Sequence, residues 1–291
     1  MISLSTIMIA KEIDLDKSKG TDQERIVTLH PSPQSLEVAG DVMIKTTFDV
    51  VLDAKHVKKN DITLEKLSEK KKKKIKGEVA YLGDEKAVTF KPEVPLEVGY
   101  YEIKIKSLKP IKEEKEKKIK EITYRFYVPE VINGYMLPLE PDEILNNSTL
   151  LGIDSNDNGI RDDVERLIIT EQAKNPNFPK THTAISLQYA WAWQKMLENP
   201  TIESDEYLAQ VSACKRYFFD KHTKNIEGYR NSRKWRREHG SMNIGLQDEL
   251  FNTKERIKQR FAFNKACSGN IFKAKKAVIS ACRTNIDMLG E

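Results

Sequence analysis

The sequence contains none of the short patterns that identify the commonest enzyme and membrane-protein classes. Its five histidines form no HExxH or other close metal pair, and there is neither a GxSxG nucleophile elbow nor a phosphate-binding P-loop. No apolar run approaches the ~20 residues that a transmembrane helix needs. The sequence therefore offers no recognisable catalytic constellation and predicts no membrane span.

Cysteine is scarce. The chain has three, Cys214, Cys267 and Cys282, and none of them forms a CxxC pair, which disfavours a zinc site. Cys214 and Cys282 both lie in apolar patterns of helical period, so we predict that they form a disulfide if the protein is exported. Three buried free thiols are the alternative that the sequence leaves open.

Charge is nearly balanced over the whole chain but is unevenly distributed. The 291 residues carry a net charge of +5, made up of +3 in residues 1–130, −6 in residues 131–170 and +8 in residues 171–291. The length favours two domains, and a hydrophobic content of 39% is enough for packed cores. An acidic segment between two basic regions is the first indication of function.

The N-terminus has an apolar run over residues 1–10 that ends in a small residue, Ala10. A secretory signal also needs a basic start, which is missing here. Residues 1–24 are therefore interpreted as a tail or as the remnant of a signal peptide, and both interpretations remain open.

Residues 25–130 predict an all-β sandwich, because apolar residues alternate and β-branched and aromatic residues are enriched between short turns. In one segment Tyr101, Ile103 and Ile105 share the face that we expect to point into the core. The segments expected to be strands are residues 42–52, 75–82, 87–91, 100–108 and 122–128.

Two lysine-rich runs, residues 70–74 and 112–120, interrupt this region and contain no aromatic residue. Nucleic-acid binding usually combines basic groups with stacking aromatics or a groove-reading helix. We therefore predict that both runs are solvated loop ends, which would also discourage pairing between sheet edges.

Three segments of this region carry a family resemblance. Residues 48–53 read FDVVLD, residues 89–105 read TFKPEVPLEVGYYEIKI, and residues 124–128 read YRFYV. They resemble the bacterial Ig-like domain family first named from surface-layer proteins. The resemblance covers about residues 25–129 and implies a structural or adhesive module, not an enzyme.

Prolines mark the exit from the β region, and residues 131–165 form a linker that ends in a calcium-loop pattern. Residues 154–165 fit D-x-[DN]-x-[DN]-G-x5-E. Calcium takes six to eight oxygen ligands, and this spacing brings such oxygens around one centre, with Gly159 at the sharp turn. The predicted ligands are the side chains of Asp154, Asn156, Asn158, Asp162 (through water) and Glu165, and the carbonyl of Ile160.

The alternative interpretation of this segment is a turn in which Asp162 or Asp163 caps the next helix, expected over residues 163–173. That interpretation leaves the fixed position of Glu165 unexplained. Because two of the side-chain ligands are amides, we expect weak binding, with a dissociation constant of about 10⁻⁴–10⁻³ M. In millimolar calcium outside the cell such a site would stay filled, so we expect the ion to have a structural role and to fix how two domains meet. A sensor is disfavoured because the sequence has one such loop and sensor loops usually work in pairs.

Position 8 of this loop is Arg161, where a paired EF-hand usually has an aliphatic residue. The loop is more similar to the single loops of thrombospondin type 3 repeats and related bacterial surface proteins. That resemblance implies an extracytoplasmic setting, in which calcium is abundant.

Residues 166–291 predict an α-helical domain, with helices over residues 184–197, 204–219, 253–267 and 271–288. Ser204 and Thr253 are the expected N-caps. The run GIDSNDNGIRDDVE, followed by NTKER and the later SG pair, is similar to a family of uncharacterised bacterial proteins. The resemblance covers roughly residues 137–290 and implies no activity.

One basic cluster of this region combines five cations with an aromatic residue. It could bind a polyanion, or it could be a solvated helix whose Trp235 packs inward and whose cations pair with the acidic segment. We favour the solvated helix. The residues of the cluster are Arg230, Arg233, Lys234, Trp235, Arg236 and Arg237.

The sequence thus predicts an exported, non-enzymatic calcium-binding protein of the bacterial envelope, with a protein or glycan partner and with nucleic acid disfavoured. An Ig-like sandwich, a calcium-loop junction and a helical domain would follow one another. The alternatives are a polyanion-binding protein and a hydrolase-type enzyme whose site forms only in the fold. A cleft that holds His182 or His222 beside a carboxylate would favour the enzyme, although both are expected to be exposed or capping.

Overall fold

The chain folds into two compact units, Met1–Val128 and Pro129–Glu291. The computed structural model describes residues 26–68, 71–111, 119–240, 242 and 244–291. The predicted tail, residues 1–24, lies outside the described residues. Each unit has its own hydrophobic core.

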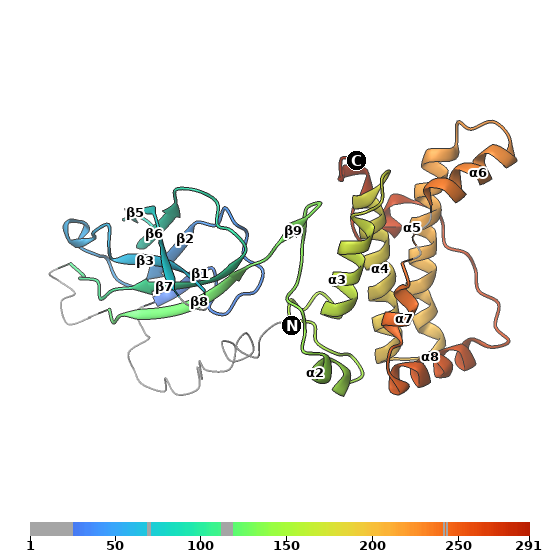
Figure 1. Cartoon of the computed structure of the whole chain (residues 1–291), viewed down its shortest axis with the longest axis horizontal. Helices are drawn as coiled ribbons and strands as arrows, with labels where there is room; N and C mark the ends of the chain where they lie inside the picture. Colours follow the sequence, from blue (N-terminus) through green and yellow to red (C-terminus); the bar gives the residue numbers. More distant parts are fainter. Residues whose placement is uncertain (1–25, 69–70, 112–118, 241, 243) are drawn as a thin grey trace. The chain divides into compact units, whose positions relative to one another are not determined.

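The first unit is a β-sandwich of two four-stranded antiparallel sheets, in the orders β1-β2-β6-β5 and β4-β3-β7-β8 (Figure 1). One continuous apolar core contains residues from both sheets. The strands are β1 (Ile26–His30), β2 (Ile44–Phe48), β3 (Ile62–Leu67), β4 (Lys72–Ile75), β5 (Gly77–Leu82), β6 (Ala87–Pro92), β7 (Gly99–Ile105) and β8 (Ile122–Val128).

Strand β7 confirms the predicted division between core and outer face. Tyr101, Ile103 and Ile105 are all buried. Tyr101 stacks on Phe126 of β8, with the ring centroids 5.5 Å apart. Tyr100 points the other way and packs against Tyr127 at 4.8 Å. The period-two alternation thus sets which face of the strand is buried.

The first lysine run is not a loop end, as the sequence predicted. Its last residues form β4, which pairs with β3 at the edge of its sheet. The side chains of Lys72, Lys73 and Lys74 are exposed there. Charged side chains of this kind block further strand addition, so the expected protection against edge pairing is provided by a strand. Most of the second run, residues 112–118, lies outside the described residues.

The second unit is mainly helical. Figure 1 shows α3, α4 and α5 side by side, with α8 across one end and α6 projecting from the end of α5. Two short strands, β9 (Val131–Ile132) and β10 (Tyr135–Met136), form a small hairpin before the helices. The helices are α2 (Glu143–Ser148), α3 (Asp162–Gln172), α4 (Pro179–Glu198), α5 (Asp205–Thr223), α6 (Tyr229–His239), α7 (Leu246–Leu250) and α8 (Lys254–Cys267), with short 3₁₀ turns η4 (Ile202–Ser204), η5 (Ile279–Ala281) and η6 (Ile286–Met288); η2 (Ala54–His56) lies in the first unit.

The N-cap predictions had different outcomes. Thr253 caps α8, because its hydroxyl accepts a hydrogen bond from the backbone N–H of Arg256 at 3.3 Å. Ser204 makes no such cap, because its hydroxyl donates to the carbonyl of Asn199. None of the helices that the structure describes is long and apolar enough to cross a membrane.

The predicted helix over residues 271–288 is wrong. This segment is irregular apart from the turns η5 and η6. The side-chain amide of Gln188 on α4 binds the backbone of this segment. It donates to the carbonyl of Ala281 at 2.8 Å and accepts from the N–H of Arg283 at 3.1 Å. Contacts with a distant helix therefore satisfy backbone groups that a local helix would have satisfied.

The predicted disulfide is present. Cys214 of α5 is bonded to Cys282 of the C-terminal segment, and Cys267 is a free thiol. Cys282 follows η5 and does not lie on a helix, contrary to the pattern on which the prediction rested. The bond holds the irregular C-terminal segment against α5.

Candidate calcium-binding loop

Residues 154–165 form a closed loop whose oxygen-bearing side chains turn inward. The carboxylate of Asp154 accepts hydrogen bonds from the backbone N–H groups of Asn158 at 3.2 Å and of Gly159 at 2.8 Å. Asp162 reaches back across the loop to accept from the N–H of Ser155 at 3.0 Å. The loop is therefore tied at both ends by carboxylates that the spacing pattern identifies as ligands.

Glu165 is in contact with two of the other predicted ligands. It is buried in the first turn of α3. One of its carboxylate oxygens accepts from the side-chain amides of Asn156 at 3.3 Å and of Asn158 at 2.8 Å. Positions 3, 5 and 12 of the loop are thus in direct contact.

Gly159 allows the sharp turn that the sequence predicts. Its φ is +83°, and Asp157 two residues earlier also has a positive φ of +60°. A Cβ at position 159 would lie 2.9 Å from Cδ1 of Trp191 on α4. Both the backbone conformation and the close approach to α4 therefore require glycine here.

Arg161, the unusual residue at position 8, is wholly buried. Its guanidinium donates to the carboxylate of Asp163 at 2.5 Å and to the carbonyl of Glu249, a residue of α7, at 2.6 Å. Gly152 (φ +72°) makes room for it, because a Cβ there would lie 2.1 Å from Cδ of Arg161. The side chain at position 8 thus packs against other residues of the same unit. In a paired EF-hand, the residue at this position would instead contact a second calcium loop.

A second wholly buried arginine, Arg256 of α8, holds the segment that leads into the loop. Its guanidinium donates to the carbonyls of Asn146 at 2.7 Å and Leu150 at 3.0 Å, and to the side chain of Asn147 at 2.8 Å. Asn146 in turn accepts from the N–H of Ile153 at 2.8 Å, just before the loop begins. Arg256 therefore anchors the entrance to the loop.

Burial and the charges around the loop together shift three pKa values. Burial raises the pKa of Asp162 to about 6, with Asp154 and Asp163 adding to the rise. Burial also acts to raise the pKa of Asp163, but the hydrogen bond and charge of Arg161 outweigh it and hold this pKa below its usual value. Burial, with the charge of Arg161, lowers the pKa of Arg256 to about 10.

The donor set suits a hard cation such as calcium. It consists of three carboxylates, two amides and one carbonyl, and it contains neither thiol nor imidazole. Within the described ranges, no three His, Cys, Asp or Glu side chains lie close enough to hold a metal ion by themselves. An ion here would therefore also need Asn156 and Asn158, whose amides now donate to Glu165 and would have to present their oxygens to the ion.

A cavity of about 250 Å³ adjoins the loop. Its lining includes Asn158 and Glu165 of the loop, Gln188 of α4 and Arg283 of the C-terminal segment. The guanidinium of Arg283 lies 4.1 Å from the ring centroid of Trp191, the residue against which Gly159 packs. One side of the loop thus faces space enclosed by α4 and the C-terminal segment.

The basic cluster predicted at residues 230–237 lies on α6, remote in sequence from the loop. Trp235 packs inward, stacking with His222 at 5.3 Å and with His239 at 4.8 Å, as the solvated-helix interpretation expected. Arg236 pairs with Asp220 of α5 at 3.1 Å. Arg230, Arg233, Lys234 and Arg237 have exposed side chains.

The structure brings the two candidate catalytic histidines together in an aromatic cluster, and the carboxylate of Asp287 lies close enough to His222 to act on its pKa. His182 and His222 share Phe178 and Phe218 as ring neighbours. His182 is wholly buried, not exposed or capping as predicted, because its ring packs among aromatics and Nδ1 lies 2.9 Å from the amide of Asn175. Among the described residues, neither histidine is hydrogen-bonded to an acidic side chain.

Comparison with known proteins gives no family. No protein-family model and no curated protein matches the chain. Similar solved structures include PcoC, a methionine-rich copper resistance protein from Escherichia coli, with 20% identity over 36% of this chain and 96% of that one at a TM-score of 0.29. CopC from Methylosinus trichosporium OB3b has 19% identity over 36% of this chain and 91% of that one at a TM-score of 0.28.

Domains 1–6 of the surface layer protein SbsC are also similar, with 14% identity over 40% of this chain and 14% of that one at a TM-score of 0.27. At such low scores these similarities carry no argument about function.

Sequence reasoning missed the residues that support the loop. Arg256 and Asn146 are separated by 110 positions, and Arg161 and Glu249 by 88. The one local signal was the placement of Asn252 and Thr253 before Arg256. Thr253 caps α8, and the side chain of Asn252 accepts from the guanidinium of Arg256 at 2.5 Å.

Proposed function

We propose that the protein is a non-enzymatic calcium-binding structural protein of the bacterial envelope, in which residues 154–165 bind one calcium ion. The observation that carries the proposal is the convergence of Asn156 and Asn158 on Glu165 in a loop closed by Asp154. When bound, the ion would supply cross-linking between these oxygens. The ion would be held by oxygen atoms of Asp154, Asn156, Asn158, Ile160, Asp162 and Glu165.

The ion would act on the architecture of the helical unit. The loop joins the segment held by Arg256 to the start of α3, and it packs on α4 through Gly159 and Trp191. A cation among its carboxylates would offset their mutual repulsion. Calcium would thereby fix the direction in which the chain enters the helices.

The strand order supports a finer assignment of the first unit. Lettered along the chain as A, B, C, C′, D, E, F and G, the two sheets have the orders A-B-E-D and C′-C-F-G. This is the arrangement of immunoglobulin-type sandwiches. We assign the unit as an Ig-like structural or adhesive module that would contact a protein or glycan at the envelope.

Two features support a location outside the cytoplasm. The Cys214–Cys282 disulfide is typical of proteins in oxidising compartments. A calcium site with amide ligands would be filled where calcium is millimolar, and rarely in the cytosol.

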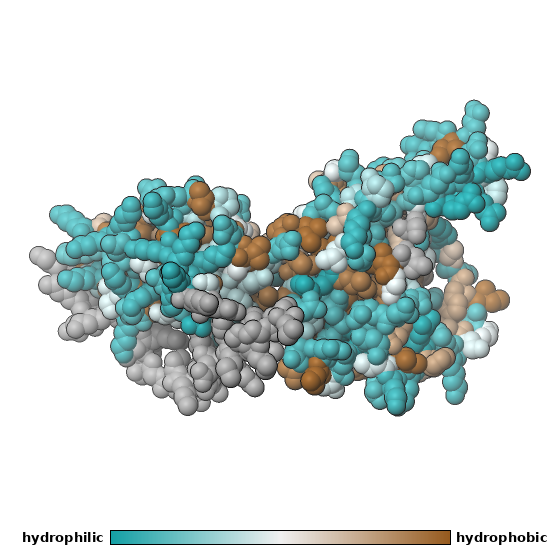
Figure 2. All heavy atoms as spheres, viewed as in Figure 1, coloured by the Kyte–Doolittle hydropathy of each residue, from teal (hydrophilic) through white to brown (hydrophobic). Residues whose placement is uncertain are grey.

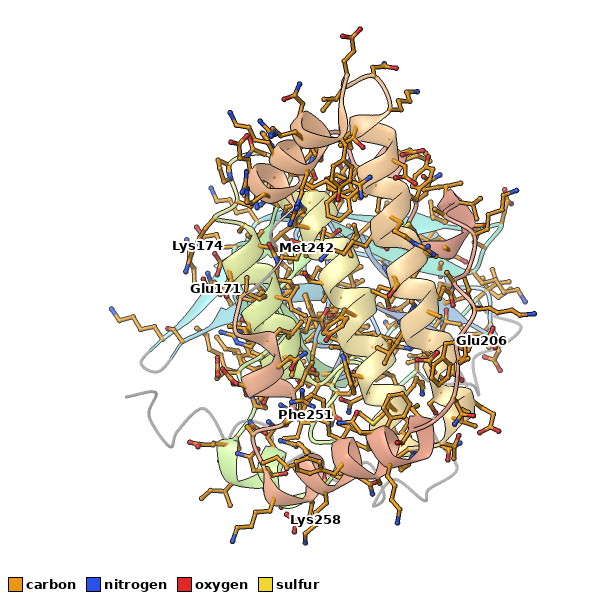
Figure 3. The ribbon with its side chains drawn as sticks, turned by 90° about the vertical axis from the view of Figure 1, so that its right-hand side faces the viewer. Glu171, Lys174, Glu206, Met242, Phe251 and Lys258 are labelled. Carbon is orange, nitrogen blue, oxygen red and sulfur yellow. A yellow bond between two sulfur atoms is a disulfide. The ribbon has the colours of Figure 1, made fainter. Side chains whose placement is uncertain are left out.

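Thermal unfolding in calcium and in chelator tests the proposal. At ten times the dissociation constant, calcium should stabilise the helical unit by about 1.4 kcal/mol, which raises its midpoint by about 4 °C. In Glu165→Gln this rise should disappear. Glu171→Gln is the matched control, because Glu171 lies on the same helix and pairs with Lys174 away from the loop (Figure 3). Equal midpoints of the wild-type protein in calcium and chelator would refute calcium binding.

A further inference from the structure

Four cations form a continuous stripe along the outer face of α6. An α-helix turns about 100° per residue, so Arg230, Arg233, Lys234 and Arg237 fall within an arc of about 100° and span about 10 Å along the axis. All four side chains are exposed. Trp235 and His239 lie on the opposite, inward face.

The stripe is not neutralised by its surroundings. Of its members, Lys234 alone has an ion pair among the described residues, a long exposed contact of 3.8 Å with Glu238. Helix α6 carries five cations and this one carboxylate. Figure 2 shows a largely hydrophilic surface over α6. A concentration of charge of one sign with so little counter-charge attracts an anionic partner.

The helix is held firmly enough to present this stripe. Trp235 stacks with two histidines, and the guanidinium of Arg236 pairs with Asp220 and lies 5.4 Å from the ring of Phe219. Gly240 ends the helix against the same ring, where a Cβ would lie 2.4 Å from Phe219. The inward residues thus fix the helix and leave the stripe to the solvent.

We propose that the stripe formed by Arg230, Arg233, Lys234 and Arg237 binds an anionic glycan. Three of the four cations are arginines, whose planar guanidinium groups bind carboxylate, sulfate and phosphate groups through two parallel hydrogen bonds. Tyr229, which is 81% exposed, flanks the stripe at the start of the helix and offers an apolar face to a sugar ring. Charge complementarity and this one aromatic define the site.

Two other classes of anionic partner fit the stripe less well. A membrane-surface helix places an apolar face in the lipid, whereas the apolar side of α6 is turned into the protein through Trp235. Binding of single-stranded nucleic acid uses several aromatics for base stacking, and Tyr229 is the one exposed aromatic of α6. The disulfide also favours a compartment in which nucleic acid is not a resident partner.

Binding of a heparin oligosaccharide, measured by calorimetry at low salt, tests the proposal. The triple variant Arg230→Gln, Arg233→Gln, Arg237→Gln should weaken binding by about tenfold or more. The triple variant Lys254→Gln, Lys258→Gln, Lys265→Gln removes the same charge from exposed positions of α8 and should change the affinity less than about twofold. Binding by the wild-type protein should weaken steeply as salt is added.

Other outcomes would overturn the proposal. The site is wrong if the wild-type protein does not bind heparin or if both triple variants weaken binding equally. The partner class is wrong if duplex DNA or phosphatidylglycerol vesicles bind more tightly than heparin at the same concentration of anionic groups. Unchanged circular dichroism should confirm that both variants fold. Because Glu165→Gln leaves α6 intact, it should not affect heparin binding, which separates this proposal from the calcium site.

Discussion

At the scale of single residues, two buried guanidinium groups provide most of the support for the loop. Arg161 joins it to the carbonyl of Glu249 on α7, and Arg256 joins α8 to the chain that enters the loop. A buried charge is stable only while its partners satisfy it. These arginines therefore make the local structure depend on correct packing of distant helices.

The first prediction concerns Arg256. Arg256→Met should lower the free energy of unfolding by about 3–5 kcal/mol, because the carbonyls of Asn146 and Leu150 and the side chain of Asn147 would be left buried without donors. Denaturant unfolding measures the change. Lys258→Gln on the exposed side of the same helix is the control (Figure 3) and should change it by less than about 0.5 kcal/mol. A loss below about 1 kcal/mol for Arg256→Met would show that the anchor is not needed.

The second prediction concerns pH. Burial lowers the pKa of His182 from 6.5 to about 4 in the folded protein. Between these values the unfolded chain binds more protons, so the free energy of unfolding should fall as pH decreases, by up to about 3 kcal/mol from this group. Above pH 6.5 the contribution is fully present. In His182→Gln, the difference in the free energy of unfolding between pH 7 and pH 4 should be smaller than in the wild type. Identical dependence of this free energy on pH in variant and wild type would show that His182 does not contribute to it.

At the scale of elements, the loop requires glycine at its entrance. In Gly152→Ala, the strain of a positive φ is combined with a clash against Arg161, so we expect a loss of about 2 kcal/mol or more. Gly134→Ala, in the turn between β9 and β10, has a similar φ but meets no atom within 4 Å, and should lose about 1 kcal/mol. Equal losses in denaturant unfolding would mean that the contact with Arg161 is unimportant.

The strands and helices differ in how far local sequence predicts them. Strand β7 follows from alternation, because its inward residues bury one face of a sheet. Strand β4 cannot be predicted from its own sequence, because a run of lysines has low strand propensity. It forms by pairing with β3, which lies beside it. The segment 271–288 has helical periodicity but is held by Gln188 and Cys214, both far away in the chain.

In the candidate site, too, the sequence predicts the local features and not those that depend on distant residues. The six predicted ligands lie within twelve residues, so their spacing alone predicts that they share one loop, in which the structure shows Asn156 and Asn158 in contact with Glu165. The support from Arg256 and Asn146 depends on contacts across 110 residues, and a single sequence carries no period or spacing that reveals them.

At the scale of the whole molecule, the disulfide links α5 to the C-terminal segment of the helical unit. Cys214 and Cys282 are 68 residues apart, so the bond should restrict the unfolded chain and contribute about 4 kcal/mol. The double variant Cys214→Ala, Cys282→Ala should lose about this amount in denaturant unfolding. Cys267→Ala, which removes the free thiol, is the control and should lose much less. Equal stability of the oxidised wild type and the double variant would contradict the prediction.

The uneven charge of the chain also has a structural meaning at this scale. Much of the −6 of residues 131–170 is gathered in and beside the loop, where a calcium ion would offset part of it. Part of the +8 of residues 171–291 lies in the exposed stripe of α6. The proposed calcium site thus lies in the acidic region of the sequence, and the proposed glycan site lies in the basic C-terminal region.

Calcium titration followed by calorimetry tests the central claim most directly. The chelator-treated wild-type protein should bind one calcium ion per chain with a dissociation constant of about 10⁻⁴–10⁻³ M. Glu171→Gln should bind in the same way, and Glu165→Gln should show no binding in this range. No calcium binding by the wild-type protein, or equal binding by Glu165→Gln, would contradict the account.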